Sequence, residues 1–265
     1  MSLPKEDFPS VPQVEDGDKL EFTPAVLGEM IDKTSFAMSH DQTRHALNGV
    51  LWEVSPAGDG EAECRMVATD GHRLAYIKRI CSGEITGDRR AIVPRKAIVE
   101  LKRILGEGKE TKVEAFFQDN RLAFRFGESV MVTRLVEGQF PDYKQVIPEE
   151  CGRKAVVNRE DFYRAVRRIA TLSSERAAPI KFLFKSGGVT VSAVNPEVGE
   201  ATEDLEAEYE GDDLAIGLNA RYVIETFSVI NQEKVGIEVN ESLSPGLIRP
   251  VGDEDYRCVI MPMRL

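Results

Sequence analysis

Two stretches of the chain, KLEFTPAVLGEMIDKTSFAMS at residues 19–39 and KAVVNREDFYRAVRRIATLSS at residues 154–174, share one pattern. Each begins with a short run of strand-forming residues and continues into an amphipathic segment. In the first stretch Val26 and Met30 recur at helical spacing, and in the second Asn158 is a suitable N-cap. The sequence therefore predicts the same strand and helix at two places, which indicates an internal repeat.

The residues that follow each stretch extend the repeat. Both copies continue with alternating or apolar runs typical of strands, then a second amphipathic segment at 93–105 or 218–230, then further strands. The order strand, helix, strands, helix, strands thus occurs twice. We expect an α+β protein made of two tandem copies of one fold, each with two helices packed on antiparallel sheet.

The segment between the two copies is EGQFPDYKQVIPEECGRK at 137–154, which is rich in Pro, Gly and charge and lacks periodicity. It predicts a short connection between domains. We place the first domain at 1–144 and the second at 145–265, because 265 residues exceed the usual size of one domain.

Composition places the chain among soluble globular proteins, with 42% hydrophobic and 30% charged residues and a formal net charge of −11. The four cysteines form no C-x-x-C pair, which favours thiols in a reducing compartment. The chain begins with no secretory signal and holds no apolar run long enough to span a membrane. We therefore expect a cytoplasmic protein.

Basic residues gather on one side of the predicted helices despite the acidic total. In the helix after Asn158, arginines 164, 167 and 168 lie opposite the apolar positions, and the helix at 94–105 has a similar basic face. For one helix, solubilising charge is the simpler explanation. Two equivalent basic helices favour a surface that attracts duplex DNA without reading its bases.

Sequence signals for catalysis or metal binding are weak. The only histidines are His40, His45 and His72, and their spacing does not suit a metal site on one helical face. Neither a nucleotide-binding loop nor a nucleophile motif is present. The segment 69–75 predicts a hairpin with a tight turn, in which Asp70 and His72 resemble a catalytic dyad only superficially. We expect no enzyme activity, no cofactor and no metal.

Four segments carry a resemblance to a known family: ATDGHRLA at 68–75, IVPRKAIVEL at 92–101, FPDY at 140–143 and VIMPMRL at 259–265. In this order and spacing they resemble the bacterial DNA sliding clamps, the beta subunits of DNA polymerase III. The resemblance covers essentially the whole chain. It implies the second and third of the family's three domains, with the first absent.

A complete family member closes as a head-to-tail dimer of six domains around DNA. By simple closure, three copies of a two-domain chain would supply six domains, so the resemblance implies self-association, with a trimer as one form. The helices of the family line the central hole. DNA-facing positions implied by the resemblance are His40, Arg44, Arg95, Lys96, Lys102, Arg103, Arg164, Arg167 and Arg168.

The resemblance also implies a pocket between the two domains for short peptides containing Gln and a Leu-Phe pair, carried by polymerases, the clamp loader and repair proteins. From the residues alone, a buried terminal strand is the better explanation of the apolar C-terminus. The implied pocket positions are Leu47, Thr69, Gly71, His72, Arg73, Leu74, Pro141, Val146, Leu243, Pro245, Val259, Ile260, Met261, Pro262, Met263 and Arg264.

Three functions remain open at this point. The first is a processivity factor that encircles duplex DNA and tethers a replicative polymerase through the peptide pocket. The second is an interaction module that binds the same peptides without closing a ring. The third is an enzyme using Asp70 or His72, for which turnover sensitive to those residues would be required.

Overall fold

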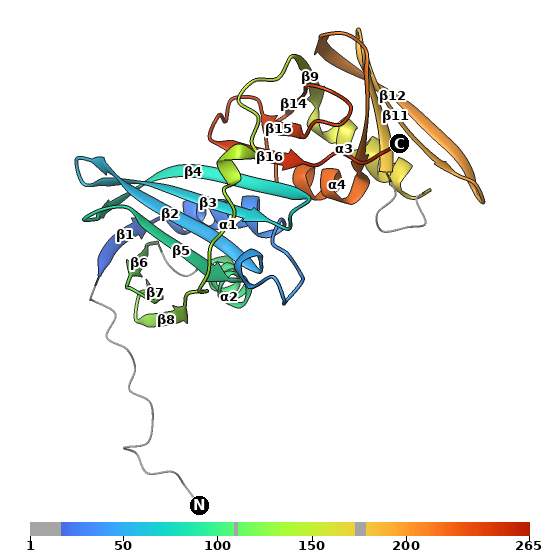
Figure 1. The fold of residues 1–265 in the computed structure, drawn as a ribbon. Coiled ribbons are helices and arrows are strands. Elements are labelled where there is room, and N and C mark those ends of the chain that lie inside the picture. Colours follow the sequence, from blue (N-terminus) through green and yellow to red (C-terminus); the bar gives the residue numbers. More distant parts are fainter. Residues whose placement is uncertain (1–16, 109–110, 173–178) are drawn as a thin grey trace, which may run out of the picture.

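The computed structural model describes residues 17–108, 111–172 and 179–265. Within these ranges, the first half contains two α-helices and eight strands (Figure 1). In chain order these are β1 (Asp18–Phe22), α1 (Pro24–Ser35), β2 (Gly49–Gly58), β3 (Glu61–Thr69), β4 (Arg73–Glu84), β5 (Arg89–Pro94), α2 (Arg95–Gly106), β6 (Val113–Phe117), β7 (Arg121–Phe126) and β8 (Ser129–Arg134).

The second half repeats this order. Its elements are β9 (Arg153–Asn158), α3 (Arg159–Ala170), β10 (Pro179–Lys185), β11 (Gly188–Asn195), β12 (Gly199–Glu210), β13 (Leu214–Asn219), α4 (Ala220–Ser228), β14 (Lys234–Val239), β15 (Gly246–Pro250) and β16 (Tyr256–Ile260). Two short 3-10 helices, His45–Leu47 and Tyr143–Gln145, lie in the connections. The predicted α+β architecture of two like-built halves is confirmed.

Local sequence determines where the helices start. The Thr23 hydroxyl accepts a hydrogen bond from the backbone N–H of Val26 at 3.3 Å, and Pro24 occupies the first turn of α1. The predicted N-cap of α3 is confirmed, because the Asn158 side chain accepts from the N–H groups of Glu160 and Asp161. These two acids in the first turn also suit the positive end of the helix dipole.

All strands belong to one continuous antiparallel sheet that runs through both halves. The halves meet where β16 pairs with β4, with Val259 opposite Leu74 and Cys258 opposite Ala75. Figure 1 shows this contact between the red end of the chain and the blue-green strand β4. The two halves therefore share backbone hydrogen bonds, which fixes their relative placement.

The four helices lie on the same face of this sheet. Buried residues of all four helices belong to one apolar cluster that also takes in the strand residues on that face. A smaller cluster on the opposite face contains residues of both halves, among them Leu74, Tyr143 and Val259, and no residue of the four α-helices. The sheet thus has a helical face and an open face.

Two of the four free cysteines meet in the core. The sulfur atoms of Cys64 in β3 and Cys81 in β4 lie 2.6 Å apart, and this contact together with burial raises the pKa of Cys64 well above its usual range. Both side chains are buried in the first half.

None of the described helices combines the length and apolar character that crossing a bilayer requires.

Candidate functional site

A small apolar cavity lies on the open face, at the junction of the two halves. Its volume is about 170 Å³, and the β3–β4 hairpin, the connection between the halves and strand β16 form its wall. Its lining residues are Leu47, Thr69, Gly71, Arg73, Leu74, Pro141, Tyr143, Val146, Val259 and Met261. The cavity is continuous with the apolar cluster that joins the halves, so its floor is packed and its mouth opens to solvent.

The turn of the β3–β4 hairpin is fixed by side-chain hydrogen bonds. The Thr69 hydroxyl donates to the carbonyl of Arg73 at 2.6 Å and accepts from the N–H of Gly71 at 3.0 Å. Gly71 has a φ of +92°, a backbone conformation that suits glycine. One oxygen of Asp70 accepts from the N–H groups of His72 and Arg73. Asp70 is therefore occupied as a turn acceptor.

Arg73 joins the hairpin to the end of α1 and to α4, and its side chain is 3% exposed. Its guanidinium donates to Asp70 at 3.1 Å, to the carbonyl of Phe36 at 2.6 Å and to Glu225 of α4. It also lies over the ring of Tyr222 at 4.4 Å. Burial raises the pKa of Glu225, but hydrogen bonds from Arg221 and Arg73 outweigh this effect and hold that pKa below its usual value.

The C-terminal segment closes one side of the cavity. The N–H of Met261 donates to the carbonyl of His72 at 2.9 Å, and the N–H of Met263 donates to the carbonyl of Gly217 at 2.8 Å. Val259 is fully buried, whereas Met261 remains 38% exposed at the mouth. The segment 259–264 therefore lies against the hairpin at 69–74, with one flexible thioether open to a ligand.

Tyr143 forms part of the cavity and was not among the predicted site residues. Its ring is buried against Tyr76, with centroids 5.9 Å apart, and its hydroxyl donates to Glu53 at 2.7 Å. Burial raises the pKa of this phenol, with a further contribution from Glu53. The signal was available, because Tyr143 ends the FPDY segment that carried part of the resemblance.

Nine predicted pocket residues line the cavity, and seven do not. The side chain of Ile260 is fully buried in the cluster on the helical face and does not line the cavity. Leu243 is 66% exposed. The predicted residues outside the lining are His72, Leu243, Pro245, Ile260, Pro262, Met263 and Arg264.

The predicted DNA-facing residues divide into exposed cations and one clear exception. Lys96, Lys102, Arg103, Arg164, Arg167 and Arg168 are exposed on α2 and α3. Arg95 differs from them, because its guanidinium donates to the carbonyls of Met38 and Ser39 at 2.9 and 3.0 Å and so holds the loop after α1. Burial lowers the pKa of Arg95.

Most of the exposed helix cations have acidic neighbours. Lys102 lies 2.5 Å from Asp32, and Arg164 lies 2.7 Å from Glu160. Arg168 pairs with Glu203 of β12, so its side chain extends toward that strand. Exposed ion pairs of this kind are weak and exchange readily, so the cations remain able to meet a polyanion.

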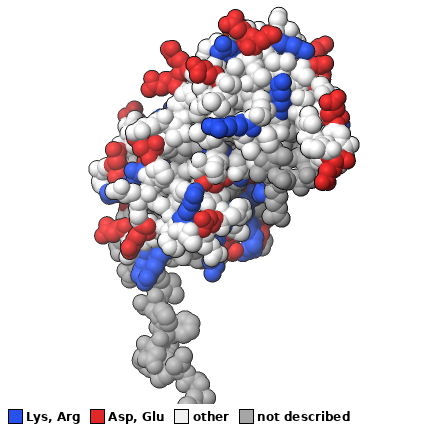
Figure 2. Space-filling view, turned by 45° about the vertical axis from the view of Figure 1, so that its right-hand side comes forward, with Lys and Arg blue, Asp and Glu red and all other residues white. Residues whose placement is uncertain are grey.

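Residues outside α2 and α3 extend the basic surface unevenly. His40 and Arg44 lie in the exposed loop after α1, and Arg44 donates to the carbonyl of Asp70 at 3.2 Å. Arg221 on α4 was not among the predicted residues, but it is exposed and occupies the position of the repeat that corresponds to Lys96. Figure 2 shows one face, on which acidic side chains gather along the margin and basic ones are dispersed between them.

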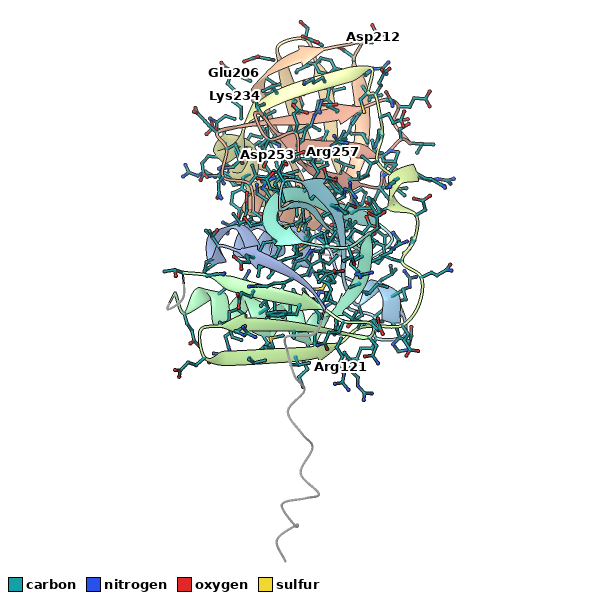
Figure 3. The ribbon with its side chains drawn as sticks, turned by 90° about the vertical axis from the view of Figure 1, so that its left-hand side faces the viewer. Arg121, Glu206, Asp212, Lys234, Asp253 and Arg257 are labelled. Atoms are coloured by element: carbon teal, nitrogen blue, oxygen red, sulfur yellow. The ribbon has the colours of Figure 1, made fainter. Side chains whose placement is uncertain are left out.

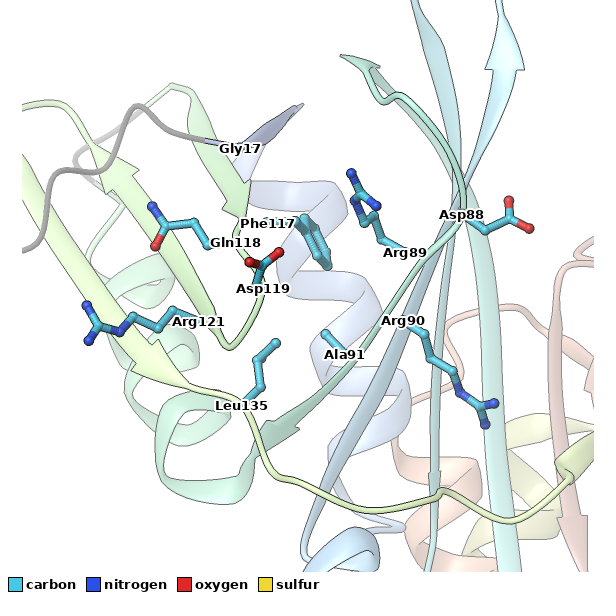
Figure 4. A pocket seen from close by; sticks show the side chains of 10 residues that line it. All are labelled: Gly17, Asp88, Arg89, Arg90, Ala91, Phe117, Gln118, Asp119, Arg121 and Leu135. Carbon is cyan, nitrogen blue, oxygen red and sulfur yellow. The ribbon is translucent and has the colours of Figure 1, made fainter.

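A polar hollow of about 640 Å³ lies elsewhere in the first half, between β5 and the β6–β7 turn (Figure 4). Arg89, Arg90 and Arg121 line it, but their side chains point in different directions. Arg89 is already paired with Asp18. Within the described ranges, no cluster of three or more His, Cys, Asp or Glu residues could hold a metal ion.

Comparison with known proteins gives one consistent result. Residues 21–142 match the family model of the DNA polymerase III beta subunit, central domain, and residues 144–264 match its C-terminal domain. The beta sliding clamp of Pseudomonas putida is 35% identical over 264 residues, which cover 100% of this chain and 70% of that protein. The Caulobacter vibrioides clamp is 34% identical, covering 99% and 70%.

Solved structures agree with these sequence matches. The DNA polymerase III subunit beta from Pseudomonas aeruginosa is 36% identical, with a TM-score of 0.91 over 99% of this chain and 71% of that one. The Bartonella birtlesii sliding clamp bound to griselimycin is 33% identical, with a TM-score of 0.89 over 99% and 70%. On the sequence matches and the shared fold together, the chain belongs to the DNA polymerase III beta subunit family, the bacterial beta sliding clamps.

Proposed function

We propose that this protein is a sliding-clamp subunit that encircles duplex DNA and tethers a polymerase through the apolar cavity between its halves. Family membership supports the proposal. The observation that carries it is the placement of two surfaces on one sheet: a helical face on which α2, α3 and α4 carry exposed cations, and an opposite face with a small apolar cavity.

The cavity suits a short peptide with an apolar anchor. Its walls are mainly apolar, and Met261 and Val146 remain partly exposed at its mouth. Burial of a Leu-Phe pair would contribute roughly 3 to 6 kcal/mol, of which the cost of association removes a large part. Each peptide then binds weakly, which allows polymerases, the clamp loader and repair proteins to exchange on one clamp.

The basic helices hold the protein near DNA without reading the base sequence. Exposed Lys and Arg side chains attract phosphates along any duplex, and the weak ion pairs at Lys102 and Arg164 give way to them. The protein therefore needs no catalytic group or cofactor for this function, and it acts in the cytoplasm. We place the domain boundary between residues 144 and 145, within the 3-10 helix Tyr143–Gln145.

The deciding experiment is retention on DNA. The protein is loaded on a nicked circular plasmid by the clamp loader of its own organism, and the bound fraction is measured before and after linearisation. A ring remains on the circle and slides from the cut ends. Equal loss from both DNAs, with intact peptide binding, would instead favour the interaction module that binds peptides without enclosing DNA.

A further inference from the structure

Two cysteines of the first half face each other in its core. Cys64 on β3 and Cys81 on β4 are free thiols, and their sulfur atoms are in contact. In the register of the two strands, Cys64 lies opposite Arg79, two residues before Cys81. Both cysteines therefore lie on the helical face of the sheet as diagonal neighbours. Because the side chains already meet, a bond between them leaves the strand pairing in place.

A hollow of about 180 Å³ leads to one of the two thiols. It lies between the start of α1 and the strands β3 and β4, and Cys81, which is 6% exposed, is among the residues that line it. All of its lining residues belong to the first half. The second half covers β4 only as far as Arg79, which Asp253 holds, and Figure 3 labels Asp253 near the middle of the molecule. A small solute can therefore approach Cys81, while Cys64 is fully buried.

The only tryptophan of the chain borders the thiol pair from the adjacent strand β2. Trp52 is fully buried, and among the described residues its indole N–H has no hydrogen-bond partner of ordinary geometry. Hydrogen bonding with Cys81, together with burial, raises the pKa of Cys64, and the indole of Trp52 opposes this only in part. Cys64 is therefore a protonated thiol in contact with the more accessible Cys81. That contact makes a reaction between the two intramolecular, which compensates for a weak nucleophile.

We propose that Cys64 and Cys81 are a redox-active dithiol that a hydroperoxide, such as hydrogen peroxide, converts to a disulfide between β3 and β4. Cys81 reacts first: its sulfur takes one oxygen of the peroxide as the O–O bond breaks, which gives a sulfenic acid and one molecule of water. The sulfur of Cys64 then displaces the hydroxyl group, so the S–S bond forms and a second water leaves. The two thiols lose two protons and two electrons, and the peroxide takes up both.

The bond closes a loop that contains the turn of the peptide cavity. Residues 65–80, between the two cysteines, include Thr69, Gly71 and Leu74 of the cavity wall. Closing this loop restricts the unfolded chain, while the native pairing of β3 with β4 remains. The oxidised protein should therefore resist unfolding better than the reduced protein and keep its cavity.

Peptide mapping of the full chain tests the bond itself. The protein is treated with hydrogen peroxide, its remaining thiols are alkylated, and it is cut with trypsin without reduction. Because trypsin cleaves after Lys and Arg, the bond would join the peptides 45–65 and 80–89. We expect this pair at the summed mass less two hydrogen atoms, and its loss after treatment with a dithiol reductant. Oxygen added to either cysteine without joining the peptides, or a bond to Cys151 instead, overturns the proposal.

The fluorescence of Trp52 follows the same reaction in the folded protein. A disulfide quenches an indole in contact with it, so the emission should fall to less than half on oxidation and recover on reduction. Cys81→Ser should abolish both this fall and the cross-linked peptide pair. Cys151→Ser is the matched control, because Cys151 is a half-buried thiol outside the pair, and it should leave both unchanged. An equal fall in Cys81→Ser would place the oxidation elsewhere and so contradict the proposal.

Denaturant unfolding measures the consequence of the bond. The midpoint of the peroxide-treated protein should lie above that of the reduced protein, and the treatment should not raise the midpoint of Cys64→Ser or Cys81→Ser. Since each variant is compared with itself before and after treatment, a variant of lower starting stability still serves as a control. A midpoint that falls on oxidation contradicts a bond that fits the native strand pairing. None of these measurements depends on DNA or on peptide binding.

Discussion

The ammonium group of Lys33 on α1 lies 3.1 Å from a carboxylate oxygen of Asp253, although 220 residues separate the two along the chain. Lys33 is 2% exposed and also pairs with Glu29 at 2.8 Å. Arg79 donates to the same two acids. This cluster ties the first half to the turn that precedes β16 and thereby holds the wall of the cavity in place.

Replacing Lys33 by Met should destabilise the protein by roughly 2 to 4 kcal/mol, because a buried network loses one cation while Asp253 keeps its ion pair with Arg79. Denaturant unfolding measures the change. Lys102→Met is the matched control, since its pair with Asp32 is exposed and its loss should change stability by less than about 1 kcal/mol. Equal losses for both variants would contradict a structural role for the cluster.

Acid should weaken the same cluster of ion pairs. Burial raises the pKa of Asp253, but hydrogen bonds from Arg79 and Lys33 outweigh it and hold that pKa below its usual value. A depressed carboxyl pKa contributes stability above the unfolded pKa near 4, and this stability is lost as the pH falls through the folded value. The free energy of unfolding should therefore fall between about pH 5 and pH 3, and less steeply in Asp253→Asn.

The control for this pH dependence is Asp255→Asn. Asp255 lies on the same turn but is 48% exposed and pairs with the partly exposed Lys78. Its replacement should leave the slope of stability against pH close to that of the unmodified chain. A slope that Asp253→Asn does not reduce would show that other carboxylates control the acid transition.

The duplicated order of elements was predictable because periodicity and capping are local properties of the sequence. Asn158 precedes an amphipathic run, and its cap formed as expected. The pairing of β16 with β4 was not predictable, since the residues of a strand specify which face is apolar and not which distant edge it joins.

The site residues show the same limit. The hairpin at 69–74 and Val259 came from recognisable segments, and the structure brings them together. The contacts of Arg95 could not be predicted, because a helical wheel gives only the direction in which a side chain leaves the helix, while this long side chain folds back to the carbonyls of Met38 and Ser39. The side chain of Ile260 lies away from the cavity, because neighbouring residues of a strand alternate between faces and only one face of β16 reaches the cavity.

Val146→Asp should weaken peptide binding by at least about tenfold, because the new carboxylate stands at the mouth of an apolar cavity and would be desolvated by a bound Leu-Phe pair. A fluorescent peptide containing Gln and Leu-Phe reports the affinity by anisotropy. Leu243→Asp is the control, since Leu243 lies outside the cavity lining and is already 66% exposed. If Leu243→Asp has the larger effect, the ligand occupies the outer rim instead.

Charge reversal on the helices tests the proposed DNA surface. Lys96 on α2 and Arg167 on α3 are exposed on the helical face, one in each half. The double variant Lys96→Glu, Arg167→Glu should bind duplex DNA more weakly, and the slope of log affinity against log salt should fall by about 0.9 for each lost phosphate contact. Titration at several salt concentrations measures both quantities.

A control must show that the weaker DNA binding comes from the position of the reversed charges and not from the change in net charge. Lys181 lies in β10, whose neighbouring residues Ile180 and Phe182 are buried on the helical side, so Lys181 faces the opposite side of the sheet. Lys181→Glu changes the net charge by the same amount as either single reversal but should leave the salt slope unchanged. If it lowers the slope as much as Lys96→Glu does, DNA responds to the overall charge, and the helical face has no special role.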